Sequence, residues 1–203
     1  MAAGRPKGEP PFVGLTGGMG AGKTEALRAL ERLGAATISS DDVVHELLAS
    51  GEVRDLLVER FGERVAPEGE VDRSAVADVV FADPEQREWL EGELWPRVGQ
   101  RIADWRAGLA RREPPPRAAV VEVPLLFEAG MQHGFDATVA IVAPDAVRGE
   151  RAAERRHSGV ESRASRQLTQ EEKAERADHV VENDGDLGDL ERTLSGVLDA
   201  VTS

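Results

Sequence analysis

The sequence predicts an α/β protein in which a parallel sheet carries one inserted helical block. Two observations support this prediction. Short apolar runs typical of buried strands alternate with longer segments in which apolar residues recur every three or four positions, and this alternation is typical of parallel sheets. One helical stretch, residues 42–112, separates the second strand from the third, and we interpret it as an inserted subdomain.

Five segments have the composition of strands. The first is an apolar run that enters a glycine-rich turn, the third is rich in valine, and the fourth ends at Pro144. The predicted strands cover residues 12–16, 35–39, 118–123, 137–143 and 179–182. In open α/β sheets, ligands bind just beyond the carboxyl ends of such strands, so polar residues at those ends are candidates for a site.

The predicted helices have recognisable starts and ends. Residues 24–33 carry leucines at helical spacing and stop at Gly34. Asp83 and Pro84 begin a long helix with one apolar stripe, and Pro96 should kink it because proline cannot donate to the carbonyl one turn earlier. A capping box at residues 169–172 begins another helix, and a final amphipathic helix spans residues 187–201.

Three tryptophans lie on the long predicted helix. Trp105 belongs to its apolar stripe and is expected in the core. Trp89 and Trp95 could line a pocket, but core packing is the favoured interpretation for both. The histidines show no metal-ligand spacing, so we assign them no role.

The composition limits the possible functions. A formal net charge of −13 should repel nucleic acid and anionic membranes, so we expect neither as a partner. The chain has no cysteine, which excludes disulfides and thiolate chemistry and is compatible with a cytoplasmic protein. No apolar run approaches the ~20 residues of a membrane span. Residues 1–11 are expected to form a disordered tail, and the chain to be a monomer or a weak homo-oligomer.

Residues 17–24, Gly-Gly-Met-Gly-Ala-Gly-Lys-Thr, match the phosphate-binding pattern G-x-x-x-x-G-K-[ST], with a predicted strand before and a helix after. The glycines let backbone N–H groups surround phosphate oxygens, and the helix adds its positive N-terminal end. Lys23 can reach the β- and γ-phosphates of ATP, and the Thr24 hydroxyl can bind Mg²⁺. The alternative, a glycine-rich turn that holds a lysine by chance, does not explain the matching strand and helix.

Carboxylates follow two of the predicted strands. Asp41 and Asp42 come directly after the second strand, where one of them could accept the proton of an attacking hydroxyl. Both could instead cap the next helix, and spacing alone leaves the two interpretations open. Glu122 ends the third strand, where a carboxylate can hold Mg²⁺ or its waters; an ordinary loop carboxylate is the alternative.

Arginines gather near the C-terminal third of this acidic chain. They are Arg148, Arg151, Arg155, Arg156, Arg163 and Arg166. Because guanidinium groups bind phosphate bidentately, the cluster is expected to supply one or two phosphate contacts. For any single arginine, a solvated helix face paired with neighbouring glutamates is the better interpretation.

With these residues in view, the chain resembles the dephospho-coenzyme A (dephospho-CoA) kinase family from about residue 12 to residue 198. The resemblance is carried by residues 14–24 with their Thr-Gly-Gly start, Ile38-Ser39-Ser40-Asp41, Leu94-Trp95-Pro96, Pro124-Leu125-Leu126-Phe127-Glu128, and the closing series Arg163, Gln167, Lys173, Ala177-Asp178 and Asn183-Asp184-Gly185. Two residues depart from the family pattern. Ser39 replaces the first aspartate of an Ile-Asp-x-Asp motif, and Trp95 replaces the histidine of a Leu-His-Pro segment.

The resemblance implies a three-layer, doubly wound parallel sheet of the P-loop NTPase type. It assigns residues 12–203 to one kinase domain, with residues 42–112 as a helical acceptor-binding insertion and residues 148–167 as a mobile lid. The implied activity is ATP- and Mg²⁺-dependent phosphorylation of the ribose 3′-hydroxyl of dephospho-CoA, which is the last step of coenzyme A synthesis.

The resemblance also implies roles for particular residues. Lys23, Asp41 and Arg163 would be catalytic, with Asp41 as the base or hydroxyl-orienting residue and Arg163 as a lid arginine. The nucleotide would be held by Gly17, Gly18, Met19, Gly20, Ala21, Gly22, Lys23, Thr24, Glu25 and Asn183. The acceptor would be held by Asp41, Pro124, Leu125, Leu126, Phe127 and Glu128, and the metal ion by Thr24 and Glu122.

Two other functions are weighed against this one. Another small-metabolite or nucleotide kinase could use the same scaffold, because the fold does not determine the acceptor. A GTP-dependent switch without turnover would usually carry an Asn-Lys-x-Asp run after a late strand, and Asn183-Asp184-Gly185-Asp186 lacks the lysine.

Overall fold

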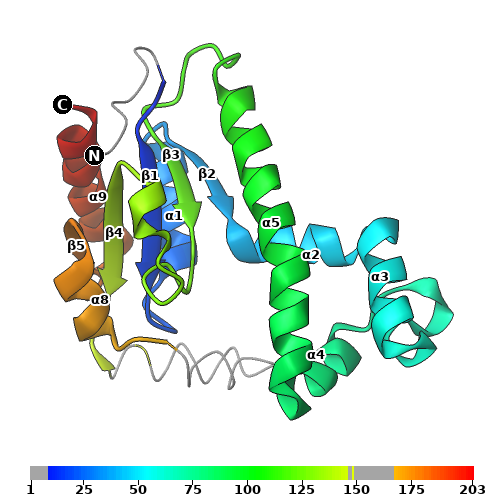
Figure 1. The fold of residues 1–203 in the computed structure, drawn as a ribbon. Coiled ribbons are helices and arrows are strands. Elements are labelled where there is room, and N and C mark those ends of the chain that lie inside the picture. The colour runs from blue at the N-terminus through cyan, green and yellow to red at the C-terminus, as the bar shows by residue number, and fades with distance from the viewer. Residues whose placement is uncertain (1–8, 146–147, 149–166) are drawn as a thin grey trace.

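The computed structural model describes residues 9–145, 148 and 167–203, and in this part of the chain helices flank both faces of a parallel sheet (Figure 1). The strands are β1 (Phe12–Gly17), β2 (Ala36–Ser39), β3 (Ala119–Glu122), β4 (Ala137–Val142) and β5 (His179–Glu182). They pair in the order β2-β3-β1-β4-β5, and every neighbouring pair is parallel. β1 is therefore central, and the carboxyl ends of all strands meet at one edge of the sheet.

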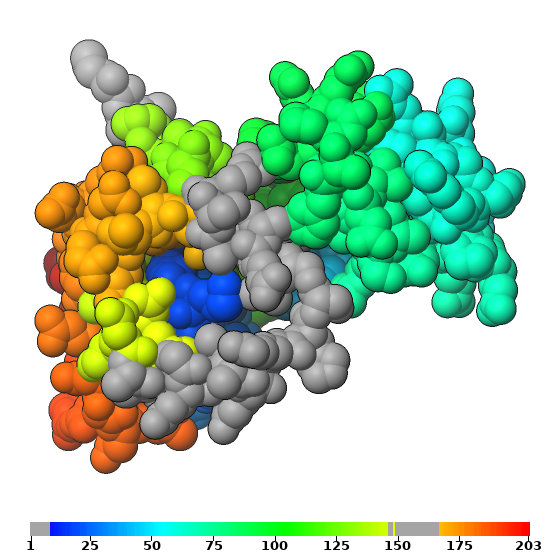
Figure 2. All heavy atoms as spheres, turned by 90° about the horizontal axis from the view of Figure 1, so that it is seen from below, coloured from blue at the N-terminus to red at the C-terminus, as the bar shows by residue number. Residues whose placement is uncertain are grey.

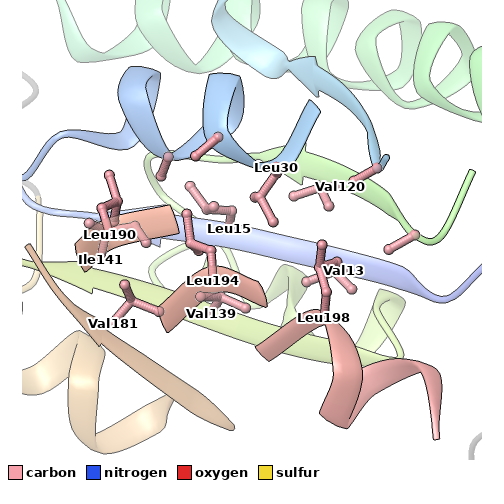
Figure 3. Packing of buried hydrophobic residues seen from close by; sticks show 14 of the residues in the cluster. Val13, Leu15, Leu30, Val120, Val139, Ile141, Val181, Leu190, Leu194 and Leu198 are labelled. Carbon is pink, nitrogen blue, oxygen red and sulfur yellow. The ribbon is translucent and has the colours of Figure 1, made fainter. Parts of the chain in front are cut away.

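The first face of the sheet is covered by two helices, α1 (Lys23–Arg32) and α9 (Leu187–Thr202), which also contact each other. Their apolar residues pack on alternate residues of the strands (Figure 3). Val120 points into this cluster whereas Val121 points to the opposite face, as the two-residue period of a strand requires. Leu194 is fully buried here, and such burial contributes about 2 kcal/mol per leucine.

The second face carries the helical block and a shorter C-terminal helix. The helices are α2 (Ser40–Leu48), α3 (Gly51–Phe61), α4 (Arg73–Ala82), α5 (Pro84–Leu109) and α8 (Gln170–Arg176), with short 3-10 turns at Glu63–Val65, Pro67–Gly69 and Met131–Gly134. A second apolar cluster joins residues of α2 to α5 with Val121, Leu126 and Phe127. The block therefore packs on the sheet through α2 and α5, while α3 and α4 lie further out (Figure 1).

The predicted strands are confirmed, with ends that differ by no more than one residue. The capping box that begins α8 is also confirmed, because Thr169 accepts the amide of Glu172 and the Glu172 side chain accepts the amide of Thr169. The helical block begins at Ser40 rather than at residue 42. A new helix begins at Gly51, where Ser50 is the N-cap and its side chain accepts a hydrogen bond from the Val53 amide.

The prediction for Trp95 is wrong. Its side chain is 53% exposed, because it directly follows the buried Leu94 and so lies about 100° around the helix from the apolar stripe. Trp105 packs partly against the apolar clusters, and Trp89 makes an edge contact with Phe61. Helix α5 runs through Pro96 as one helix, and the Arg97 guanidinium donates to the Glu93 carbonyl at 2.7 Å beside the missing amide.

The N-terminal residues that are described belong to the fold. Pro11 is buried and its carbonyl accepts the Ala119 amide, while the Glu9 carboxylate lies 3.3 Å from the Arg106 guanidinium. Residues 1–8, the greater part of the predicted tail, lie outside the described residues. In the described part of the chain, no helix is long and apolar enough to cross a membrane.

Candidate active site

The glycine-rich loop connects the central strand β1 to helix α1 at the carboxyl edge of the sheet. Gly20 and Gly22 have φ values of 75° and 93°, a left-handed conformation that side chains with a Cβ rarely adopt. Gly22 is the N-cap of α1 and supplies no side chain to the helix amides. The first amides of a helix have no acceptor within the helix, so this end of α1 can bind an anion.

Part of the N-terminal segment can be seen from the carboxyl edge of the sheet. Figure 2 looks onto it, with the blue N-terminal segment visible between the cyan and green helical block and the yellow and orange C-terminal part. Thr24 is exposed and Glu25 is half-buried in the first turn of α1. The loop and the start of α1 can therefore meet a ligand that enters from this side.

Lys23 is the first residue of α1 and turns its ammonium group back over the loop. Its Nζ donates to the carbonyls of Gly17 and Gly18 at 3.1 and 3.3 Å, and it lies 3.9 Å from Oε1 of Glu122. The side chain is only 16% exposed. The positive charge is thus held between the loop and the end of β3.

Glu122 is a buried carboxylate at the end of β3, next to β2 in the sheet. Because Ser39 of β2 is its register partner, the Ser39 hydroxyl can donate to Oε2 of Glu122, and it does so at 2.8 Å. Burial raises the pKa of Glu122 above its ordinary value of 4.5, and this outweighs the Lys23 charge and the Ser39 hydrogen bond, which lower it. The sequence missed Ser39 as a site residue; parallel pairing of the two strand ends was the signal that could have found it.

Replacing Glu122 with glutamine is expected to change how stability depends on pH. The raised pKa means that the folded chain holds this proton more tightly than the unfolded chain, so the Glu122 contribution to stability falls as pH rises above 4.5. The melting temperature of Glu122→Gln, relative to that of the native chain, should therefore rise between about pH 4 and about pH 8. Calorimetry at several pH values measures this gain, with the exposed strand-end variant Glu182→Gln as control. A gain that does not depend on pH would contradict the prediction.

Asp41 and Asp42 lie in the first turn of α2 and not on the end of β2. Asp41 is half-buried and Asp42 is exposed. The charge of each raises the pKa of Glu122, with Asp41 the larger contributor of the two. Asp41 is therefore the aspartate with the stronger electrostatic influence on Glu122.

The segment Pro124–Glu128 follows β3 as a turn. Pro124 and Leu125 are half-buried, whereas Leu126 and Phe127 are buried in the second apolar cluster. Glu128 forms an ion pair with Lys173 of α8 at 3.0 Å. The two apolar residues in the middle of the segment thus fix it to the core, and its first two residues remain accessible.

Two side chains from the C-terminal half hold the glycine-rich loop. The buried Asn183 donates from Nδ2 to the Ala21 carbonyl at 2.9 Å, so it helps to hold the loop in place. Arg148 donates from Nε to the Met19 carbonyl at 3.1 Å and pairs with Asp145. A Cβ at Gly20 would lie 2.7 Å from the Arg148 carbonyl, so only glycine fits there.

Arg163, like Arg151, Arg155, Arg156 and Arg166, lies outside the described residues.

Comparison with known proteins decides the family. The family pattern described as dephospho-CoA kinase matches residues 11–189, nearly the whole chain. The chain belongs to the dephospho-CoA kinase family. The dephospho-CoA kinase of Moorella thermoacetica is 38% identical over 182 residues, which cover 87% of this chain and 85% of that protein. The dephospho-CoA kinase of Symbiobacterium thermophilum is 39% identical over 194 residues, covering 92% and 78%.

A solved structure has the same fold over nearly the whole chain. The crystal structure of TT1252 from Thermus thermophilus has a TM-score of 0.78 and 34% identity, and the match covers 95% of this chain and 98% of that one. The predicted resemblance to dephospho-CoA kinases is therefore confirmed, together with the P-loop α/β fold and the class of nucleotide-using kinase.

Proposed function

We propose that the chain transfers the γ-phosphoryl group of ATP to the ribose 3′-hydroxyl of dephospho-CoA, giving coenzyme A and ADP. The observation that carries the proposal is the convergence of Lys23, Glu122 and Asp41 on one edge of the sheet, beside a phosphate-binding loop in a dephospho-CoA kinase chain. A cation for the phosphates and a carboxylate for the attacking hydroxyl are the parts that phosphoryl transfer requires.

The residues at this edge fit a magnesium ion. Mg²⁺ is usually held by one or two protein oxygens and by substrate phosphates, rather than by a cage of side chains. The exposed Thr24 hydroxyl and the Glu122 carboxylate provide such oxygens, and within residues 9–145, 148 and 167–203 no larger group of acidic or histidine side chains could hold a metal ion. When bound, the ion would neutralise charge on the β- and γ-phosphates.

In the proposed reaction, Asp41 accepts the proton of the 3′-hydroxyl as its oxygen attacks the γ-phosphorus. The bond from that phosphorus to the β-γ bridging oxygen breaks, and ADP leaves. Lys23 and the amides at the start of α1 stabilise the negative charge that spreads over the phosphoryl oxygens. Arg163, in the predicted lid, would add a further positive charge.

The acceptor is proposed to lie between the helical block and the segment Pro124–Glu128. Asp41 is in the first turn of α2, so the proposed base is carried by the helical block itself. Pro124 and Leu125, which follow β3 at the same edge of the sheet, are half-buried. The proposed partner is a small molecule, and we propose no nucleic-acid or membrane partner. The protein is proposed to be cytoplasmic and to be a monomer or a weak homo-oligomer.

Replacing Thr24 with valine is expected to weaken metal-dependent ATP binding. Valine keeps the shape of threonine and loses the hydroxyl that would bind Mg²⁺. Titration calorimetry of ATP with and without Mg²⁺ should show that the metal strengthens binding to the native chain and much less to Thr24→Val. The matched control is Thr24→Ser, which keeps the hydroxyl. A chelator should stop turnover of the native enzyme. Full metal-dependent activity in Thr24→Val would contradict the role.

The reaction itself is tested by one assay. The chain is mixed with ATP, Mg²⁺ and dephospho-CoA, and the position of the new phosphate in the product is determined by phosphorus NMR. A panel of nucleosides and other hydroxyl metabolites is screened by thermal shift, since the true acceptor stabilises the fold by mass action. A phosphate on another hydroxyl, or preference for another acceptor, would refute the proposed substrate and favour another small-metabolite kinase.

A further inference from the structure

Lys173 is a fully buried lysine that no step of the proposed reaction uses. It lies on α8 with 0% exposure, although lysine is among the residues least often buried. Its Nζ is 3.3 Å from Oγ1 of Thr16, 2.5 Å from the Pro124 carbonyl and 3.0 Å from Oε1 of Glu128. An ammonium group has three N–H donors, so all three are used. A charge buried at such cost needs a reason beyond filling space.

The three acceptors of Lys173 belong to elements that form the site. Thr16 immediately precedes the first glycine of the phosphate-binding loop, and its own hydroxyl donates to the Pro124 carbonyl at 3.4 Å. Pro124 and Glu128 are the two ends of the segment proposed to hold the acceptor. The Lys173 side chain therefore connects β1, which leads into the phosphate-binding loop, to both ends of the segment Pro124–Glu128.

Glu128 extends this connection to the chain that enters α8. Its Oε1 also accepts the amide of Leu168 at 2.8 Å, two residues before the helix begins. The carboxylate is nearly buried, and among the described residues its Oε2 has no hydrogen-bond partner. The carboxylate therefore acts through Oε1 alone, which receives both the Lys173 charge and the Leu168 amide.

We infer that Lys173 and Glu128 are positioning residues, which hold the segment Pro124–Glu128 at a fixed place relative to the phosphate-binding loop so that the acceptor meets the nucleotide correctly. This inference rests on the proposed function. A charged, three-way contact has direction, whereas apolar contacts such as those of Leu126 and Phe127 allow small shifts. A shift of about 1 Å between two reactants can cost roughly 10²-fold in rate.

The test separates positioning from stability with a double variant. Lys173→Met alone leaves the buried Glu128 charge unpaired and should lower the melting temperature by roughly 10 °C. Adding Glu128→Gln removes that charge and keeps an oxygen for the Leu168 amide, while Thr16 still serves the Pro124 carbonyl. The double variant should therefore regain most of the melting temperature. Arg176→Met, an exposed position on the same helix, is the control.

Steady-state kinetics of the folded double variant then decide the inference. We expect KM for dephospho-CoA to rise and kcat/KM for it to fall roughly 10²-fold, with KM for ATP little changed. Hydrogen exchange should be faster in peptides that contain residues 124–130 and 167–173 than in the native chain, and unchanged in α9. Native-like kinetics, or a loss shared equally by ATP and the acceptor, would overturn the inference whatever the melting temperature. If the native chain does not phosphorylate dephospho-CoA, the proposed function fails, and the exchange experiment still tests the connection.

Discussion

Replacing Lys23 with alanine is expected to lower turnover by roughly 10³-fold, the scale for losing one preorganised group that stabilises transition-state charge. The ammonium group is held by the Gly17 and Gly18 carbonyls, within the loop that we propose binds the phosphates. In the folded chain it is therefore already placed before the nucleotide arrives. Alanine removes the charge and leaves the glycine backbone, so we expect kcat to fall far more than ATP affinity.

The fold should survive this change. Lys23 belongs to neither apolar cluster, and its removal opens no cavity among the buried leucines. Circular dichroism and the melting temperature check the fold, and steady-state kinetics with dephospho-CoA measure the effect. Arg32→Ala is a suitable control on the same helix, because its ion pair with Glu191 is at the surface and such pairs contribute little. Near-native activity in a folded Lys23→Ala chain would refute the assignment of the loop.

Most of the fold could be predicted because its sequence pattern is local. The strands are short apolar runs bounded by turn residues, and α8 begins at a capping box that uses neighbouring side chains only. The loop at residues 17–24 could be predicted for the same reason, since its glycines and lysine are contiguous. Local patterns of this kind need no knowledge of which strands pair.

Contacts between distant residues could not be predicted in the same way. The burial of Lys173 depends on three acceptors, the furthest of which is 157 residues away in the sequence. Nothing near Lys173 indicates that its side chain points inward, because helix α8 is otherwise strongly polar. The hydrogen bond from Ser39 to Glu122 joins residues 83 apart and depends on the register of β2 and β3. The order of the strands in the sheet brings such residues together, and no local sequence pattern predicts that order.

The start of the helix that carries Asp41 and Asp42 was predicted two residues too late. The helical stretch was expected to begin at residue 42, but helix α2 begins at Ser40, so both aspartates are helical. Successive helical residues are about 100° apart, and this separates their directions. The different exposure of the two side chains, half-buried for Asp41 and exposed for Asp42, follows from that separation.

Replacing Asp41 with asparagine is expected to lower kcat by roughly 10²-fold or more, the scale for a positioned general base. Asparagine has nearly the same shape but cannot accept the proton of the 3′-hydroxyl. ATP affinity should change little, because Asp41 lies on α2 and would contact the acceptor rather than the nucleotide. Steady-state kinetics with dephospho-CoA, combined with titration of ATP, separate these two effects.

Asp42→Asn is the matched control, since it makes the same chemical change one residue further along the same turn. Asp42 is exposed, and asparagine serves near a helix start almost as well as aspartate, so the activity of this variant should be close to native. Both changes remove one negative charge near Glu122, and a general electrostatic effect would therefore appear in both variants. A large loss in Asp41→Asn alone identifies the base. A large loss in Asp42→Asn alone would reverse the assignment, and native activity in both would mean that neither aspartate takes the proton.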